Sequence, residues 1–388
     1  MTKTLYKNAQ VFTGKNEQFE SLNFVMDDEN GRFVQEKQGD QTVDLAGKYV
    51  MPGMINAHTH IVADPYGKIA QLGSPDATAP TATFLALNNL QKLLADGVTY
   101  IRDVGSIADI DIELAALERQ GELFAPGIVA SGSPLTMTGG HFSAGSYEVD
   151  GVDEVRKYAR VLLKKGVNNI KLMVTGGVSF DGETPHDIQL TEAELKAAVE
   201  EAHHKGRTAN AHAQGTEGIQ NALRAGVDSI EHAVYLDEKT IEMFLQKGTY
   251  IVPTLAAPWA INQNSETLPD FMVKKSIELA QAHIQSIGKA AKAGVKLAMG
   301  TDSGTAFNNF DKNSSIELEL MADAGVTNLQ VLQAATVNAA QLLQIDQQAG
   351  TIEPDKMADF IVLDENPLTE IKVLQKEKTV YKKGKKVE

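Results

Sequence analysis

The sequence predicts an α/β protein: a (β/α)8 barrel of the TIM type, with a small β-sandwich domain built from both ends of the chain. Three observations lead to this prediction. Helical stretches alternate with short β-branched runs through the middle of the chain. About eight such runs can be counted, the number that a barrel of this type needs. Short alternating strands occupy both ends.

The middle of the chain repeats a unit in which a helical stretch ends at a glycine and a β-branched run begins. Glycine suits the left-handed position that follows a helix. Helix starts are visible as well, because Thr191 with Glu194 and Thr327 with Gln330 fit the capping-box pattern. The repeated unit occurs at residues 95–101, 165–170, 225–230, 247–252 and 293–297.

Strands that alternate with helices of this length indicate parallel βαβ units. A doubly wound open sheet is the alternative architecture, but no glycine-rich dinucleotide fingerprint follows any of the strands. The predicted strands lie near residues 50–56, 98–103, 127–131, 168–174, 207–213, 227–232, 249–254 and 295–301.

The two ends of the chain have a different character. Short alternating runs, such as those at residues 4–6, 9–12 and 24–26, are separated by Gly, Asn and Asp and predict a small antiparallel sheet. Similar runs return near the C-terminus. We therefore expect residues 1–50 and 348–388 to form one β-sandwich domain, and residues 51–347 to form the barrel inserted between them.

Composition narrows the classes of function. The net charge of −15 argues against a nucleic acid or an anionic membrane as partner, since both require a basic surface. No stretch approaches 18 consecutive apolar residues, and the first residues have no apolar signal region, so a soluble, cytoplasmic protein is expected. The chain has no cysteine, and any metal must therefore be held by His, Asp, Glu or a modified Lys.

A pair of histidines marks the end of the first predicted barrel strand. His58 and His60 follow the largely apolar residues 50–55. Side chains two residues apart in a strand point the same way, so both imidazoles can reach one metal ion. The alternative interpretation is two histidines in a turn after a core strand. The metal interpretation is strengthened by further candidate ligands downstream.

Polar residues also close the later strands, where barrel enzymes carry their active sites. His212, His232 and Asp302 each follow an apolar run, and taken singly each could equally cap or form a turn. Lys171 lies inside a predicted strand, where a free ammonium is costly to bury. It could extend its ammonium to solvent, pair with a carboxylate, or carry a carbamate that bridges two metal ions.

The remaining candidates have plain interpretations. His203, His204 and His283 fall on predicted helices and are expected at the surface. Asp103 either supports a ligand or forms a turn. His186 falls in a long loop that could touch substrate. Pro258 and Trp259 follow the seventh predicted strand and either line the pocket or pack against the fold.

The pattern as a whole resembles the amidohydrolase superfamily of metal-dependent hydrolases. The resemblance rests on residues 52–60 (PGMINAHTH), on Lys171 followed by residues 175–177 (TGG), and on residues 138–141 (TGGH). It covers almost the whole chain, including the C-terminal return at residues 350–360. Within the superfamily the chain is most similar to imidazolonepropionase-related proteins and to binuclear, prolidase-like Xaa-Pro and Xaa-Arg/Lys dipeptidases. Lys171 favours the dipeptidases, because imidazolonepropionases proper bind one metal and have no bridging lysine.

The resemblance implies a role for each candidate. His58, His60 and Asp302 would hold a buried metal, His212 and His232 a more exposed one, and carboxylated Lys171 would bridge the two divalent ions together with a hydroxide. Asp302 would also shuttle the proton. His141 would orient the substrate carbonyl, and Tyr235 would bind a substrate carboxylate. Phe142 departs from the pattern, since relatives often have glycine there. Ligands without sulfur suit Zn²⁺, and also Mn²⁺, Fe²⁺ or Co²⁺.

The leading hypothesis from the sequence is a binuclear hydrolase that cleaves a C–N amide bond with a metal-activated hydroxide. The expected substrate is a small molecule, a dipeptide or an N-acyl amino acid. One alternative is a mononuclear cyclic-amide hydrolase or deaminase. Another is a metal-binding scaffold without catalytic activity. A homo-oligomer is also expected.

Overall fold

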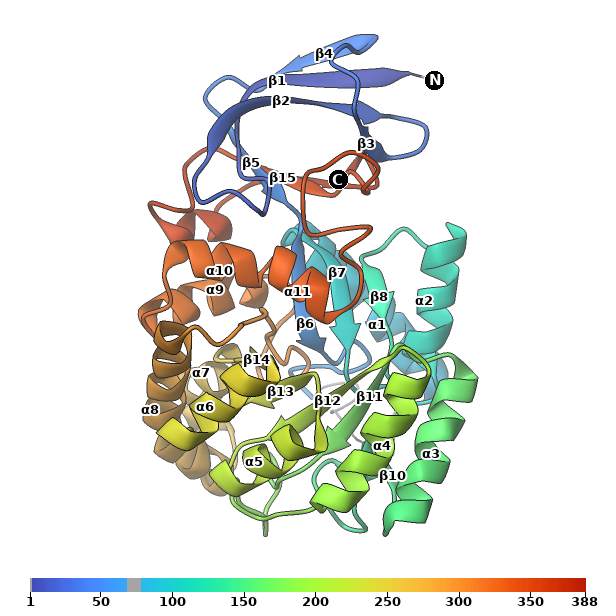
Figure 1. The fold of residues 1–388 in the computed structure, drawn as a ribbon, viewed down its shortest axis with the longest axis vertical. Helices are drawn as coiled ribbons and strands as arrows, with labels where there is room; N and C mark the ends of the chain where they lie inside the picture. Colours follow the sequence, from blue (N-terminus) through green and yellow to red (C-terminus); the bar gives the residue numbers. More distant parts are fainter. Residues whose placement is uncertain (1, 68–77) are drawn as a thin grey trace.

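The structure is a computed structural model that describes residues 2–67 and 78–388. It is an α/β fold in which a sheet made from both ends of the chain lies at one end of the molecule (Figure 1). Parallel strands and the helices that cover them make up the rest. None of the helices in these two ranges combines the length and the apolar character that a membrane-spanning helix requires.

The sheet at the chain ends, here called the terminal sheet, mixes parallel and antiparallel pairs. β15 pairs antiparallel with β5, so strands from the two ends share one sheet. β1 pairs antiparallel with β2 but parallel with β4 and β5, which corrects the expected antiparallel sheet. The chain reaches β4 by a crossover rather than by a tight hairpin turn, and crossovers place strands in parallel. The members are β1 (Lys3–Val11), β2 (Glu20–Asp27), β3 (Arg32–Val34), β4 (Gln41–Asp44), β5 (Tyr49–Pro52), β15 (Phe360–Leu363), β16 (Thr379–Lys382) and β17 (Lys385–Lys386).

The middle of the chain forms two parallel sheets. One contains β6 (Met54–Thr59), β7 (Val98–Asp103) and β8 (Gly127–Val129). The other contains β9 (Leu135–Thr136), β10 (Tyr147–Glu148), β11 (Asn169–Met173), β12 (Thr208–Ala213), β13 (Ser229–His232) and β14 (Tyr250–Val252). Seven of the eight predicted strands coincide with β6, β7, β8 and β11 to β14.

The eighth predicted strand, at residues 295–301, is not a regular strand. Leu297 forms a single parallel bridge with Ile251 of β14. Met299, two residues after Leu297, accepts a hydrogen bond at its carbonyl from the Ala57 N–H of β6 at 2.7 Å. A Cβ at Gly300 would lie 2.3 Å from a Val252 methyl. The segment therefore passes from one sheet to the other, because its hydrogen bonds go to β14 at residues 296–298 and to β6 from Met299 onwards.

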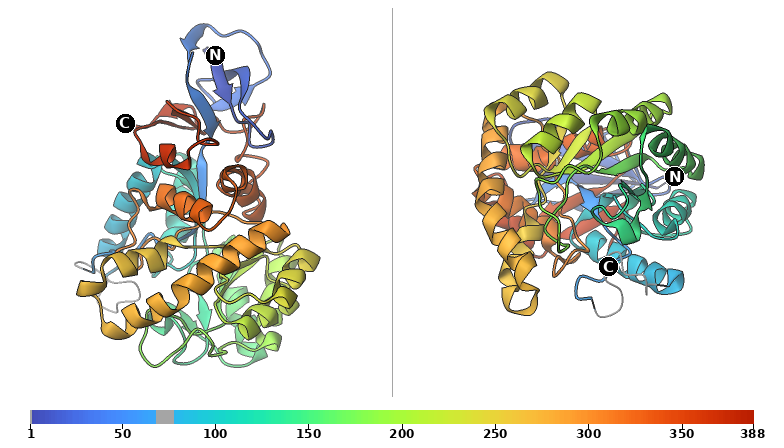
Figure 2. Two further views of the ribbon diagram at one scale, coloured as in Figure 1. Left: turned by 90° about the vertical axis from the view of Figure 1, so that its left-hand side faces the viewer. Right: turned by 90° about the horizontal axis from the view of Figure 1, so that it is seen from below.

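The helices cover the outer side of the parallel strands (Figure 2). Both predicted capping boxes are present, at Thr191 and Thr327. Gly166, Gly226, Gly248 and Gly294 end their helices in the left-handed conformation, as the repeated unit predicts. The helices are α1 (Ala79–Ala95), α2 (Ile110–Gln120), α3 (Val152–Lys165), α4 (Glu192–His204), α5 (Thr216–Ala225), α6 (Glu238–Lys247), α7 (Ala256–Gln263), α8 (Asp270–Ala293), α9 (Asn313–Asp323), α10 (Asn328–Ala334) and α11 (Val337–Leu342), with 3-10 turns at Ser143–Gly145, Ser265–Thr267 and Ile371–Gln375.

A continuous apolar core fills the space between the parallel strands and these helices. β6 and β7 point away from the terminal sheet in Figure 1, so their carboxyl ends lie deep in the other part of the molecule. Catalytic side chains of such folds are found at the carboxyl ends of the strands. The polar residues that close the strands are therefore brought together away from the terminal sheet.

Candidate metal centre and active site

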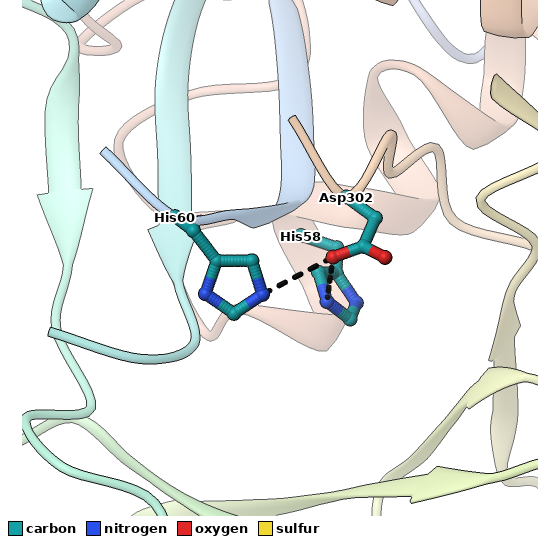
Figure 3. A group of neighbouring side chains, drawn as sticks. All are labelled: His58, His60 and Asp302. Carbon is teal, nitrogen blue, oxygen red and sulfur yellow. Dashed lines mark ion pairs between the residues drawn. The ribbon is translucent and has the colours of Figure 1, made fainter. Parts of the chain in front are cut away.

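His58, His60 and Asp302 form a compact group of potential metal ligands (Figure 3). His58 lies in β6, His60 follows that strand, and Asp302 follows the segment at residues 295–301. The Nε2 atoms of both histidines lie 3.1 Å from the same Asp302 oxygen, Oδ1. One ligand atom from each residue lies within 4.8 Å of the others. This is a candidate His-His-Asp metal site, and its members are those predicted from the sequence.

Electrostatics keeps Asp302 ionised. Burial alone would raise the pKa of its carboxyl group, but the adjacent His58 and His60 imidazoles lower that pKa well below its usual value. Asp302 also adopts a left-handed backbone conformation, with φ 61°. Such conformations cost energy for residues other than glycine and are concentrated at functional sites.

His212 and His232 extend this group. They lie in β12 and β13, and the residue after His212 is paired with His232 in the sheet. The His232 ring centroid is 4.6 Å from that of His212 and 5.3 Å from that of His58. Burial lowers the pKa of both His212 and His232 well below the usual value, so both are neutral at pH 7. A neutral imidazole keeps one lone pair for a metal ion.

His58, His60, His212 and His232 share a property that metal ligands typically have: one ring nitrogen is engaged with a protein acceptor. For His232 the direction of the bond is defined, since the Thr254 hydroxyl gives its own proton to the Pro253 carbonyl. The partners are the Glu231 carboxylate for His58, the Gly105 carbonyl for His60, the Gly176 carbonyl for His212 and the Thr254 hydroxyl for His232. The other nitrogen of each ring could bind a metal ion, and for His58 and His60 this is the Nε2 atom that lies 3.1 Å from Asp302 Oδ1.

Lys171 lies in β11 with only 1% of its surface exposed. Burial lowers the pKa of its amine to about 8, against the opposing effect of the Glu231 and Asp302 carboxylates. Among the described residues no hydrogen bond or ion pair holds its Nζ atom. Its side chain instead lines the same cavity as the four histidines and Asp302. A buried amine with a lowered pKa and no fixed partner suits conversion to a carbamate that metal ions would neutralise.

Two residues that sequence reasoning missed support this centre. The Glu231 carboxylate accepts from His58 Nδ1 at 2.7 Å and from Arg102 Nη2 at 2.8 Å. Arg102 also donates from Nε to the Ala57 carbonyl at 2.7 Å. Burial opposes ionisation of Glu231, but Arg102 and then His58 outweigh it and lower the pKa of this carboxyl group below its usual value. No local motif signals the pair, because it joins β7 to β13 across the interior.

His141 lies against the second half of the histidine group. Its ring stacks on that of His212, with centroids 4.2 Å apart. Its Nδ1 atom lies 2.5 Å from the Glu183 carboxylate, which leaves Nε2 free. The next residue, Phe142, has φ 57°. Glycine adopts this conformation without strain, whereas phenylalanine adopts it at a cost in energy.

A cavity of about 530 Å³ joins these residues. Its lining includes all six predicted ligands, His141 and Phe142. Most of its remaining wall is apolar, and Val178, Val234, Ile261 and Leu279 form a small hydrophobic cluster there. Tyr235 does not line the cavity. Its ring packs on that of His186, with centroids 4.7 Å apart.

The other expectations have mixed outcomes. His203 and His204 are exposed on α4 as expected, with His203 paired to Asp228. His186 is exposed and outside the cavity lining, as is the half-buried Trp259, whereas Pro258 lines the cavity.

Asp103 supports the backbone beside a candidate ligand. Its carboxylate accepts from the Ile61 N–H at 2.7 Å, directly after His60. The expectation for His283 is wrong: this residue is 1% exposed. It lies on the inner face of α8, in line with Leu279 and Ile287 one turn away on either side.

Comparison with known proteins decides the family. Residues 49–387 match the family model of the amidohydrolase family. The chain belongs to the amidohydrolase family. It is 33% identical to ochratoxinase from Aspergillus niger over 370 residues, which cover 87% of this chain and 75% of the relative. A 5-methylthioadenosine/S-adenosylhomocysteine deaminase from Bacillus cereus is 25% identical over 403 residues, 93% of this chain and 85% of the relative.

A solved structure agrees with this family. The crystal structure of a Xaa-Pro dipeptidase with bound methionine in its active site superposes with a TM-score of 0.91 at 29% identity, and covers 99% of both chains. Family membership makes this chain an enzyme, a metal-dependent hydrolase acting on carbon–nitrogen bonds. The similarity to prolidase-like proteins that the sequence indicates is also found.

Proposed function

We propose that this amidohydrolase is a binuclear hydrolase that cleaves the amide bond of a dipeptide or an N-acyl amino acid. The observation that carries the proposal is the Lys171 amine, which is buried in the cavity among the five other predicted ligands and has no hydrogen-bond or ion-pair partner among the described residues. The similarity to a Xaa-Pro dipeptidase and to ochratoxinase supports the substrate class.

The proposed centre divides its ligands between two divalent ions, with Zn²⁺ the leading candidate for a ligand set of nitrogen and oxygen. His58, His60 and Asp302 would hold the first ion, and His212 and His232 the second. A carboxylated Lys171 would bridge them. The carbamate and Asp302 would supply two negative charges, which offset half of the four positive charges of two divalent ions.

When bound, the ions would polarise the scissile carbonyl and lower the pKa of water from about 15.7 towards about 7. Asp302 would accept a proton from the attacking water and deliver it to the amine nitrogen as the C–N bond breaks. His141, held at Nδ1 by Glu183, would direct its free Nε2 to the carbonyl oxygen. Tyr235 would contact the substrate carboxylate from beside Val234.

The proposed architecture around this site is a closed (β/α)8 barrel with a terminal β-sandwich domain, divided near residues 50 and 348. Support comes from the segment at residues 295–301, which bonds to β14 at Leu297 and to β6 at Met299. A bridge between Thr59 and Ser303 continues the second contact.

A panel of substrates combined with metal analysis tests the function. Protein prepared in metal-supplemented medium is assayed with dipeptides, N-acyl amino acids, cyclic amides and aminopurine nucleosides. Two metals per chain with turnover of dipeptides or N-acyl amino acids is the expected result. One metal with turnover of cyclic amides or nucleosides favours the mononuclear alternative. The similarity to a deaminase is the reason to include nucleosides in the panel.

A further inference from the structure

A hydrogen-bonded ring encloses His232 at the ends of β13 and β14. The His232 Nδ1–H donates to the Thr254 hydroxyl at 2.6 Å, and this hydroxyl donates to the Pro253 carbonyl at 2.6 Å. The Nε2–H of His283 then donates to the Pro253 carbonyl and to the His232 carbonyl, both at 2.9 Å. The ring thus starts at the side chain of His232 and returns to its own backbone.

The ring acts where the backbone is strained. His232 has φ 72° and Thr254 has φ 57°, both left-handed, and Thr254 is β-branched. Residues other than glycine keep such conformations only where their surroundings enforce them. Thr254 and His283 are almost completely buried, so their hydrogen bonds are not exchanged for bonds to bulk water. His283 reaches this point from α8, and it ties that helix to both strand ends.

We propose that Thr254 and His283 are positioning residues that hold His232 with its Nε2 atom towards the second metal position. The inference rests on the proposed binuclear function. The Thr254 hydroxyl has already given its proton to Pro253, so it can only accept from His232 Nδ1. Nε2 is then the nitrogen with the free lone pair. The hydrogen bond from His283 to the His232 carbonyl fixes the backbone of His232, from which the imidazole extends.

The effect is confined to one of the two metal positions. Within the described residues, the side-chain hydrogen bonds of Thr254 and His283 reach His232 and no other proposed ligand. His58 and His60 are held instead by the Glu231 carboxylate and the Gly105 carbonyl. Loss of the ring should therefore weaken the second ion and spare the first. A general packing role would lower the stability of the fold without this difference between the positions.

The test uses two pairs of variants of the full-length protein. Thr254→Val keeps the side-chain shape but removes the hydroxyl, whereas Thr254→Ser keeps the hydroxyl. His283→Leu removes the donor, whereas His283→Gln retains an N–H that can reach the two carbonyls. Metal-free protein is titrated with Co²⁺ in competition with a chelator, and the visible absorption of each bound ion is followed. Thermal unfolding of the metal-free proteins reports the stability of the fold.

Thr254→Val and His283→Leu should weaken the second Co²⁺ by about 10–100-fold and change its spectrum, as expected for loss of a partner that orients a metal-binding histidine. The first Co²⁺ should bind as in the wild type, and Thr254→Ser and His283→Gln should stay close to wild type at both positions. Wild-type affinity at the second position in Thr254→Val would overturn the inference, and so would equal weakening at both. A wild-type protein that binds one Co²⁺ would overturn the proposed binuclear function itself, before any variant is compared.

Discussion

Substitution of Glu231 by Gln tests the buried ion pair that supports the candidate metal centre. The change keeps the size of the side chain but removes its negative charge. The guanidinium of Arg102, which is fully buried and 2.8 Å from Glu231, then loses its counter-ion. Breaking a buried ion pair from one side typically costs about 3–5 kcal/mol, because the remaining charge is left uncompensated in the interior.

The expected change in melting temperature follows from the length of the chain. An unfolding entropy of about 2.1 cal/mol/K per residue gives roughly 0.8 kcal/mol/K for 388 residues. A loss of about 3–5 kcal/mol therefore corresponds to a decrease of about 4–6 °C. Arg102→Met combined with Glu231→Gln should cost less than the two single changes added together, since both charges leave the interior at once.

The assay is thermal unfolding of the metal-free proteins, so that metal binding does not contribute to the difference. Glu192→Gln is the matched control. It makes the same chemical change in an exposed ion pair with Arg224, whose Nε lies 2.7 Å from the carboxylate, and such pairs contribute about 1 kcal/mol or less. If Glu231→Gln unfolds at the same temperature as Glu192→Gln, the burial argument for the Arg102–Glu231 pair is refuted.

Three further substitutions probe the proposed chemistry. Lys171→Ala should lose one or both metals and most activity, with partial recovery in short-chain carboxylic acids; elemental analysis and turnover measure this, and wild-type turnover would exclude the carbamate. Asp302→Asn should lower kcat by a factor on the order of 10² or more, and a retained kcat with full metal content would remove Asp302 from proton transfer. Tyr235→Phe should lower kcat/KM about 10–100-fold for substrates with a free carboxylate, from a hydrogen bond worth about 1.5–3 kcal/mol. Equal losses on C-terminally amidated substrates would show that Tyr235 does not bind the carboxylate.

Features that depend on local pattern could be predicted from the sequence. The glycine-terminated helices and the capping boxes follow from short-range chemistry, and seven of the eight predicted parallel strands coincide with strands of the structure. Once the strands are predicted, the side chains at their carboxyl ends can be identified as candidates for one common site. His58 and His60 meet Asp302 in space although more than 200 residues separate them, because parallel strands bring their carboxyl ends to one side.

Features that depend on contacts between distant elements could not be predicted. In the sequence, Glu231 and Arg102 have no feature that sets them apart from other charged residues. Their pairing depends on the arrangement of β7 and β13 in space. His283 was misplaced because α8 gives an ambiguous pattern: Ile277 and Ile284 are exposed on the same helix that buries His283. The segment at residues 295–301 has the composition of a strand, but it bonds to β14 at Leu297 and to β6 at Met299. It therefore does not form a regular strand.

An anomalous difference map from crystals of the protein grown with Zn²⁺ tests the binuclear centre most directly. The account predicts two strong peaks per chain in the cavity, one beside His58, His60 and Asp302 and the other beside His212 and His232. Density should extend from Lys171 Nζ to a group of atoms between the peaks. A single peak, or two peaks beside an unmodified Lys171 side chain, would contradict the proposal of a carbamate-bridged pair of metal ions.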